Sequence, residues 1–144
     1  MIDYNKLLNK VSREIKPSGI RKYFDIAATL DDVISLGIGE PDFYTPWPIR
    51  QAAIKALERG KTFYTSNSGL IKLREVISEY TFKRTGVKYD PASEIIVTVG
   101  GSEAIDLTVR ALVEEGDEVI IPEPSFVCYK PIVALAGGTP VTIN

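Results

Sequence analysis

The sequence predicts an α/β fold from two observations. Short apolar runs with the composition of strands occur at residues 94–99, 118–121 and 141–143. Between these runs, apolar residues recur at helical spacing and charged residues occupy the opposite face. Continuous apolar strands that alternate with amphipathic helices are typical of a sheet covered by helices on both faces.

The first part of the chain predicts two helices and a strand that lead into a loop. One helix is expected over residues 5–15, because the residue before Pro17 disfavours the helical conformation. A second helix is expected over residues 20–30 and a short strand over residues 33–36. Residues 37–48 are rich in glycine and proline, which indicates a surface loop or a junction between lobes.

Two amphipathic helices are expected next. Pro48 suits a first helical turn and Gly60 ends that helix, while the second helix begins near Leu70 and stops at Gly86. The remaining elements alternate between strand and helix, over residues 94–99, 102–115, 118–121, 126–136 and 141–143. Because the last of these is a core strand with nothing after it, we expect the chain to be cut short.

Composition excludes several classes of function. The net charge of −2 over 144 residues does not suggest a nucleic-acid-binding or membrane-binding surface, and no apolar run approaches the ~18 residues of a membrane span. The chain has no histidine, so a Ser-His-Asp triad and HExxH zinc chemistry are excluded. The single cysteine, Cys128, excludes an internal disulfide and fits a reducing cytoplasm.

The segment Gly100-Gly101-Ser102 lies between a predicted strand and a predicted helix. Backbone N–H groups converge at a helix N-terminus, the helix dipole adds partial positive charge, and glycines let a phosphate approach the backbone. Ser102 can cap the helix or donate its hydroxyl group to the anion, and the alternative is a turn with a capping role only. The dinucleotide motif is absent, because Asp42 stands where Gly37-Ile38-Gly39 would require a third glycine. The P-loop motif GxxxxGK[ST] is absent as well. A single-phosphate ligand is therefore expected.

Three other residues have both a functional and a structural interpretation. Gly39 can bring its amide close to a ligand carboxylate or can belong to a connecting turn. Tyr64 can donate its hydroxyl group to a phosphate or anchor its loop by packing. Phe126 follows a strand at the carboxyl end of the sheet, where it can cover a planar ring or pack in the core. None of these residues is a credible nucleophile, so a cofactor would have to supply any chemistry.

The motifs occur together in an order that resembles the amino-terminal part of a class I/II aminotransferase. These enzymes are fold type I pyridoxal-phosphate-dependent proteins of the aspartate aminotransferase superfamily. The resemblance covers essentially the whole chain and rests on five motifs: Ser18-Gly19-Ile20-Arg21-Lys22, residues 36–43, Tyr64 with Gly69 and Leu73-Arg74, residues 100–104, and residues 122–129.

The resemblance implies a role for each matching residue. Gly101, Ser102 and the Glu103 amide would hold the cofactor phosphate while Gly100 shapes the turn, and Phe126 would stack on the pyridine ring. Gly39 and Ile20 match positions near the substrate. Tyr64 matches the tyrosine that reaches the phosphate of the neighbouring subunit. A homodimer is thus implied, with residues 1–36 as an arm and small-domain segment. Residues 37–144 would form an incomplete three-layer α/β/α cofactor-binding domain.

The Schiff-base lysine of this family would lie beyond Asn144, so no catalytic residue is assigned here and the 144-residue chain is expected to be inactive. The expected activity of the parent protein is transfer of an amino group between an L-amino acid and a 2-oxo acid in the cytoplasm, with pyridoxal 5'-phosphate as cofactor. A carbon–sulfur lyase or another lyase on the same fold, and a non-catalytic phosphate-binding α/β module, are the alternatives.

Overall fold

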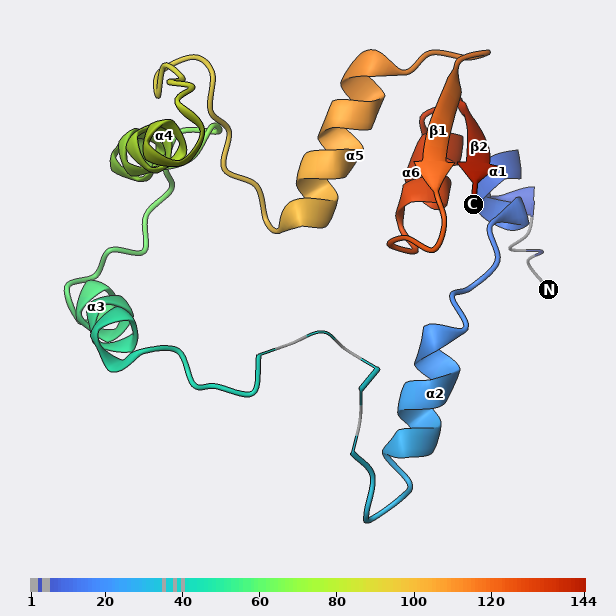
Figure 1. Cartoon of the computed structure of the whole chain (residues 1–144), viewed down its shortest axis with the longest axis horizontal. Coiled ribbons are helices and arrows are strands. Elements are labelled where there is room, and N and C mark those ends of the chain that lie inside the picture. The colour runs from blue at the N-terminus through green and yellow to red at the C-terminus, as the bar shows by residue number, and fades with distance from the viewer. Residues whose placement is uncertain (1–2, 4–5, 35, 38, 40) are drawn as a thin grey trace. The chain divides into compact units, whose positions relative to one another are not determined.

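The structure of the chain is a computed structural model that describes residues 3, 6–34, 36–37, 39 and 41–144. The chain divides into two compact units (Figure 1). Unit 1 comprises Met1–Gly37 and Val99–Asn144, and unit 2 comprises Ile38–Thr98. The predicted domain boundary between residues 36 and 37 stays a prediction.

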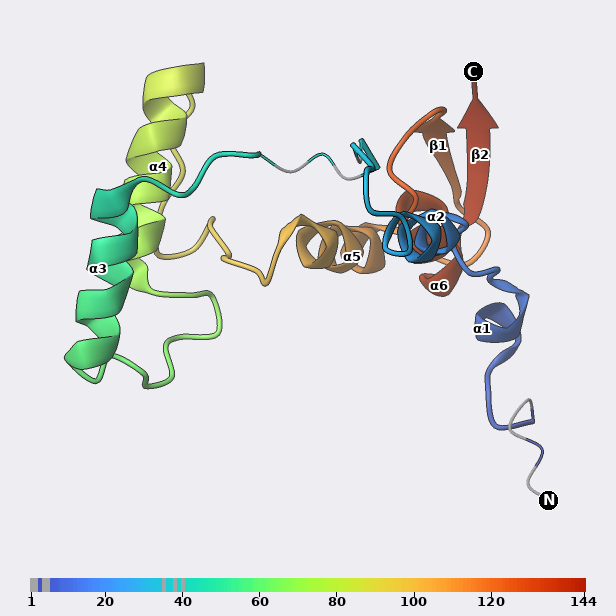
Figure 2. The same cartoon turned by 90° about the horizontal axis from the view of Figure 1, so that it is seen from below.

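The centre of unit 1 is a parallel β-α-β unit. Strands β1 (Glu118–Pro122) and β2 (Thr139–Ile143) pair in parallel and are joined through helix α6 (Tyr129–Leu135). The two strands lie side by side in both Figure 1 and Figure 2. Parallel strands require a crossover connection, which α6 provides. The buried apolar side chains among the described residues belong to this unit: Ile121, Ile132 and Val133.

Gly138 lets β2 begin close to this core. A Cβ atom on Gly138 would lie 2.5 Å from Cγ1 of Val113 and 3.2 Å from Cγ1 of Val133. A larger residue would therefore displace two apolar side chains.

Three further helices belong to unit 1: α1 (Lys10–Glu14), α2 (Ile20–Ala27) and α5 (Gly101–Leu112). The side chain of Asn9 caps α1 by accepting the Ser12 N–H at 2.8 Å. Helices α1 and α5 both contact α6. Helix α1 is shorter than the expected helix over residues 5–15, and residue 5 lies outside the described residues.

Unit 2 contains helices α3 (Trp47–Glu58) and α4 (Ile71–Thr85). Pro48 lies in the first turn of α3, and Gly86 ends α4 in the left-handed conformation at φ 75°, as predicted. Two buried polar side chains of α4 form hydrogen bonds with the backbone of the segment that follows the helix. The Arg74 guanidinium donates to the carbonyl oxygens of Pro91 at 2.6 Å and Ala92 at 3.1 Å. The Ser78 hydroxyl donates to the backbone carbonyl oxygen of Tyr89.

Two of the predicted strands are absent from the described part of the chain. Residues 94–99 do not form a strand, although Val97 donates its backbone N–H to the carbonyl oxygen of Ser68 at 3.0 Å. Residues 33, 34 and 36 are not in a strand either, and residue 35 lies outside the described residues. A strand requires a ladder of hydrogen bonds to a neighbour, and in the described residues only β1 and β2 form one. The prediction of these two strands is wrong in this respect.

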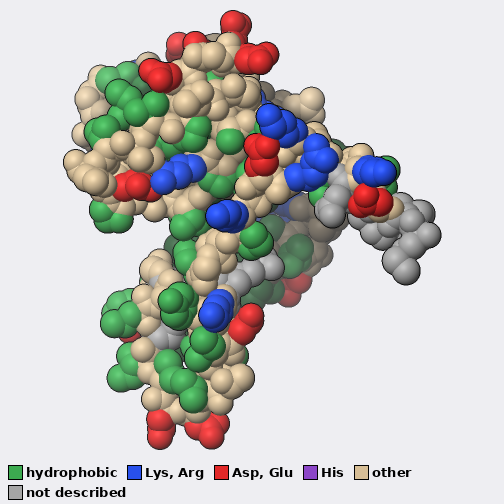
Figure 3. All heavy atoms as spheres, turned by 90° about the vertical axis from the view of Figure 1, so that its right-hand side faces the viewer, with side chains coloured by type: hydrophobic (Ala, Val, Ile, Leu, Met, Phe, Trp, Pro, Cys, Tyr) green, Lys and Arg blue, Asp and Glu red, His purple; other side chains and the backbone are tan. Residues whose placement is uncertain are grey.

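Charged and hydrophobic side chains are interspersed on the surface shown in Figure 3. Lysines and arginines lie among acidic side chains on that face. Within the described residues, no helix has the length and apolar character required to span a bilayer.

Candidate functional site

The turn before α5 depends on the backbone of Gly100. This residue adopts φ 88° and ψ 165°, a region that is essentially restricted to glycine. A Cβ atom on Gly100 would meet nothing within 4 Å, so backbone conformation rather than space requires glycine here. The helix begins at the next residue, Gly101.

The N-terminal turn of α5 is open and exposed. Its N-cap residue is Gly100, which makes no side-chain capping bond, and the first helical residues Gly101, Ser102 and Glu103 are exposed. The space beside Gly101 is also open, because a Cβ atom there would meet nothing within 4 Å. The first N–H groups of a helix have no partner within the helix, and the helix dipole favours an anion beside them. This turn can therefore bind an anion.

Of the two roles that the sequence allows Ser102, capping of the helix is not the one found. Because α5 begins at Gly101, Ser102 is its second residue and lies inside the first turn. Its hydroxyl group can still donate to an anion at the N-terminus, which is the other role predicted from the sequence.

The side chain of Glu103 takes part in the turn in a way that the sequence reasoning missed. The backbone N–H of Val99 donates to Oε2 of Glu103, so the carboxylate reaches back across Gly100 and Gly101. A glutamate at the third helical position is also found in the capping box, where it accepts the N–H of the N-cap residue, whereas here it accepts the N–H of the residue before the N-cap. The position of Glu103 three residues after Gly100 could have indicated this contact, had the helix been predicted to begin at Gly101 instead of Ser102.

Phe126 lies in the loop that connects β1 to α6. The side chain of Phe126 is 52% exposed, and its ring packs edge-to-face against Tyr129 with a centroid distance of 5.8 Å. Glu123 of the same loop forms an ion pair with Lys130 of α6, and its backbone N–H donates to the Ile143 carbonyl at 2.7 Å. In the view of Figure 1, this loop follows the lower end of β1, and the N-terminal end of α5 is the lower end of that helix. Unit 1 thus has both an exposed helix N-terminus and an accessible aromatic ring.

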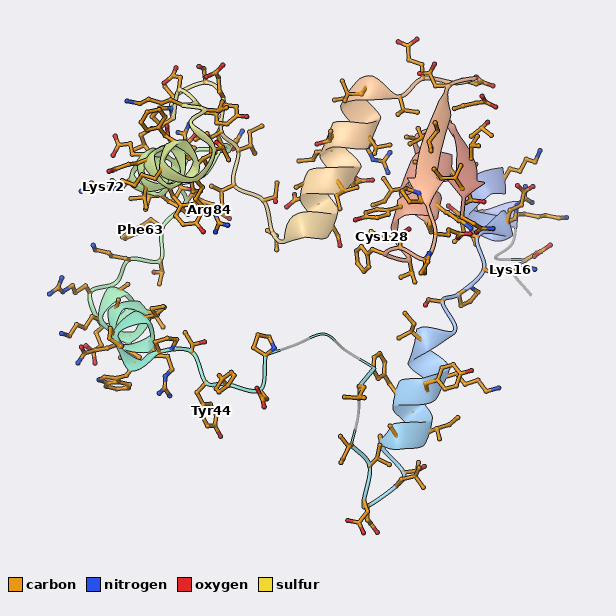
Figure 4. The ribbon with its side chains drawn as sticks, in the orientation of Figure 1. Lys16, Tyr44, Phe63, Lys72, Arg84 and Cys128 are labelled. Atoms are coloured by element: carbon orange, nitrogen blue, oxygen red, sulfur yellow. The ribbon has the colours of Figure 1, made fainter. Side chains whose placement is uncertain are left out.

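The other predicted residues lie elsewhere in the chain. Ile20 is the first residue of α2 and is 40% exposed. Gly39 and Tyr64 belong to unit 2, and the Tyr64 side chain is fully exposed. Cys128 immediately precedes α6 and is partly buried (Figure 4). The roles of Ile20, Gly39 and Tyr64 toward a ligand stay predictions.

Asp90 and Glu79, both in unit 2, have lowered pKa values. The pKa of Asp90 is lowered, first by the hydrogen bond from the Ser93 hydroxyl and then by the Ala92 backbone N–H. The pKa of Glu79 is lowered by the hydrogen bond and the charge of Lys83. The described residues contain no group of His, Cys, Asp or Glu that could hold a metal ion.

Comparisons with known proteins agree on one family. The family described as aminotransferase class I and II matches residues 31–144. A putative aminotransferase of Bacillus subtilis is 56% identical over 137 residues, which cover 95% of this chain and 36% of that protein. A probable N-acetyl-LL-diaminopimelate aminotransferase of B. subtilis is 46% identical, over 96% of this chain and 35% of that protein.

A solved structure gives the same result. The structure of Thermus thermophilus aspartate aminotransferase with maleate matches with a TM-score of 0.85 at 36% identity, over 94% of this chain and 36% of that one. The chain therefore spans about a third of the length of the relatives that it matches. The comparisons confirm the predicted resemblance and the α/β fold class.

Proposed function

Because this chain belongs to the family of class I and II aminotransferases, we propose that the whole protein transfers an amino group between an L-amino acid and a 2-oxo acid, using pyridoxal phosphate. The observation that carries the proposal is the turn before α5, where the N-cap residue Gly100 has no side chain and the first helical residues lie beside open space. The proposal concerns the whole protein because the chain spans about a third of its relatives.

The residues of the turn fit a phosphate group. The amides of Gly101, Ser102 and Glu103 and the Ser102 hydroxyl would donate to its oxygens, and the N-terminus of α5 would stabilise its charge. The twelve residues of α5 make a helix long enough to carry a dipole of this kind. Gly100 lets the chain turn at the point where the phosphate approaches.

Phe126 fits the aromatic part of the cofactor. Its edge-to-face contact with Tyr129 orients the ring, and about half of the side chain remains exposed for a planar ligand to cover. The Glu123–Lys130 ion pair and the bond from Glu123 to Ile143 restrain the loop that carries it. When bound, pyridoxal phosphate acts as an electron sink for the electrons released when the substrate α-carbon loses its proton.

The remaining predicted roles belong to the whole protein. Gly39 and Ile20 would lie near the substrate, and Tyr64 would reach the phosphate of the neighbouring subunit in a cytoplasmic homodimer. The full exposure of the Tyr64 side chain is compatible with a contact outside this chain. The relatives' names differ in their substrates, so the proposal specifies an amino donor and a 2-oxo acid acceptor and no particular pair.

Two observations test the proposed function. The coding sequence after Asn144 should contain the family's Asn-Pro, Asp and Ser-x-x-Lys contexts, and their absence there would exclude an aminotransferase. The whole protein should then exchange amino groups only when a 2-oxo acid is present. Release of ammonia or a thiol without a 2-oxo acid would instead indicate a lyase on the same fold.

A further inference from the structure

We propose that the side chain of Glu103 is a positioning residue for the phosphate turn, acting through the backbone of Val99 and Gly100. This inference rests on the proposed function, because it assumes that the turn binds the cofactor phosphate. The family resemblance assigns only the amide of Glu103 to that phosphate. The structure adds a separate role for the carboxylate.

The hydrogen bond closes a ring around the two glycines. Val99 donates its N–H to Oε2 of Glu103, four residues later in the chain. Gly100 and Gly101 lie between these two residues, and Gly100 has the glycine-specific conformation that begins the helix. The bond therefore connects the residue before the turn to the first turn of α5.

Packing does little to hold the residue before the turn. The Val99 side chain is 93% exposed, and the space beside Gly100 and Gly101 is open. Two adjacent glycines have wide conformational freedom, so a turn of this kind samples other conformations unless a specific contact restrains it. The Glu103 carboxylate provides such a contact at the Val99 amide.

This restraint has a direct consequence for binding. Apparent affinity falls by the fraction of molecules in the competent conformation, so a restraint that preorganises the turn increases phosphate affinity. The negative charge of Glu103 does not itself favour an anionic ligand. What the site requires from Glu103 is an acceptor oxygen that reaches Val99, and a glutamine carbonyl of the same length can replace it.

Three substitutions separate reach from charge. Glu103→Gln keeps the length and an acceptor oxygen, whereas Glu103→Asp keeps the charge but is one methylene shorter. Glu103→Ala removes both features. A matched control is Asp106→Ala, one turn further along α5, which removes a half-buried carboxylate that pairs with Arg110. Each variant is titrated with pyridoxal phosphate, observed by its ³¹P resonance and absorbance, while amide exchange is followed at Val99.

The inference predicts a clear order of affinities. Glu103→Ala and Glu103→Asp should bind about fivefold more weakly, with faster exchange at Val99, because a capping contact is lost. Glu103→Gln should bind within about twofold of the unmodified chain, since a capping acceptor is retained. Asp106→Ala should leave both affinity and Val99 exchange unchanged.

Other outcomes have separate meanings. Equal affinity of Glu103→Ala and the unmodified chain would overturn the inference, and so would a loss in Glu103→Gln as large as in Glu103→Ala. If Glu103→Ala does not fold, the difference in affinity between Glu103→Gln and Glu103→Asp still tests the inference. Absence of binding by the unmodified chain and by every variant would contradict a phosphate site at this turn and overturn the inference, whereas the proposed amino transfer is decided separately by the whole protein's requirement for a 2-oxo acid.

Discussion

Gly100 combines φ 88° with ψ 165° in open surroundings, so its requirement for glycine comes from the backbone alone. We predict that Gly100→Ala lowers the free energy of unfolding by about 1–3 kcal/mol, the usual cost of such a conformation for a residue with a Cβ atom. Gly101→Ala is the control, because its Cβ atom meets nothing within 4 Å and its φ is ordinary. Urea unfolding of both variants checks this, and an equal effect of the two would contradict the backbone argument.

Gly69 illustrates the opposite situation, in which space also matters. A Cβ atom on Gly69 would lie 2.8 Å from Cβ of Val97, and the residue has φ 94°. Gly60 has φ 64° with nothing within 4 Å. We predict that Gly69→Ala is more destabilising than Gly60→Ala by about 1–3 kcal/mol, the typical cost of overpacking. Thermal unfolding of the two variants measures the difference, and equal stabilities would show that Val97 moves aside without cost.

Arg74 is the described residue whose position was hardest to predict. Charged side chains are almost never fully buried unless they are paired, and the pattern of α4 alone does not distinguish Arg74 from its exposed neighbours. The structure buries it because its guanidinium satisfies two carbonyl oxygens of the segment after the helix. Only the tertiary contact explains this, and it lies 17 and 18 residues away in sequence.

The turn that follows α4 has a pH-dependent contact. Asp90 accepts hydrogen bonds from the Ser93 hydroxyl at 2.6 Å and the Ala92 N–H at 3.0 Å, which lower its pKa below the usual 3.8. The stability from a carboxylate with a lowered pKa is present above the unfolded pKa and is lost as the pH falls through the folded pKa. We predict that Ser93→Ala raises the pKa of Asp90 toward its usual value.

Titration of the Asp90 carboxyl carbon by NMR measures this change. Thr108→Ala removes a hydroxyl group from α5 and serves as a control that should leave Asp90 unaffected. An unchanged pKa of Asp90 in Ser93→Ala would mean that the Ser93 hydroxyl does not stabilise the ionised form.

The helices and strands divide into those that local sequence determines and those that need a partner. The end of α4 was predicted because Gly86 has the left-handed conformation that ends a helix. Strands β1 and β2 were predicted from short apolar runs that alternate with a helical pattern, and the structure pairs them in parallel. Residues 94–99 have the composition of a strand, but no neighbouring strand pairs with them in the described part of the chain. Composition cannot supply that partner.

At the scale of the whole molecule, few of the large apolar side chains among the described residues are buried. Three apolar side chains are buried among the described residues, whereas Leu36, Tyr64 and Val99 are more than nine-tenths exposed. Extensive exposed apolar surface indicates contacts that this chain does not make by itself. We predict that the chain binds the dye ANS at neutral pH without denaturant, as measured by fluorescence. A chain with no dye binding would contradict this account of its surface.

The central claim is that the turn before α5 binds the phosphate of pyridoxal phosphate. Its most direct test is an amide chemical-shift titration of the ¹⁵N-labelled chain with pyridoxal phosphate. We predict that the largest shifts occur at Gly101, Ser102 and Glu103, and that Gly100→Ala reduces them. Titration without shifts at these three amides, or with the largest shifts in unit 2, would contradict the claim.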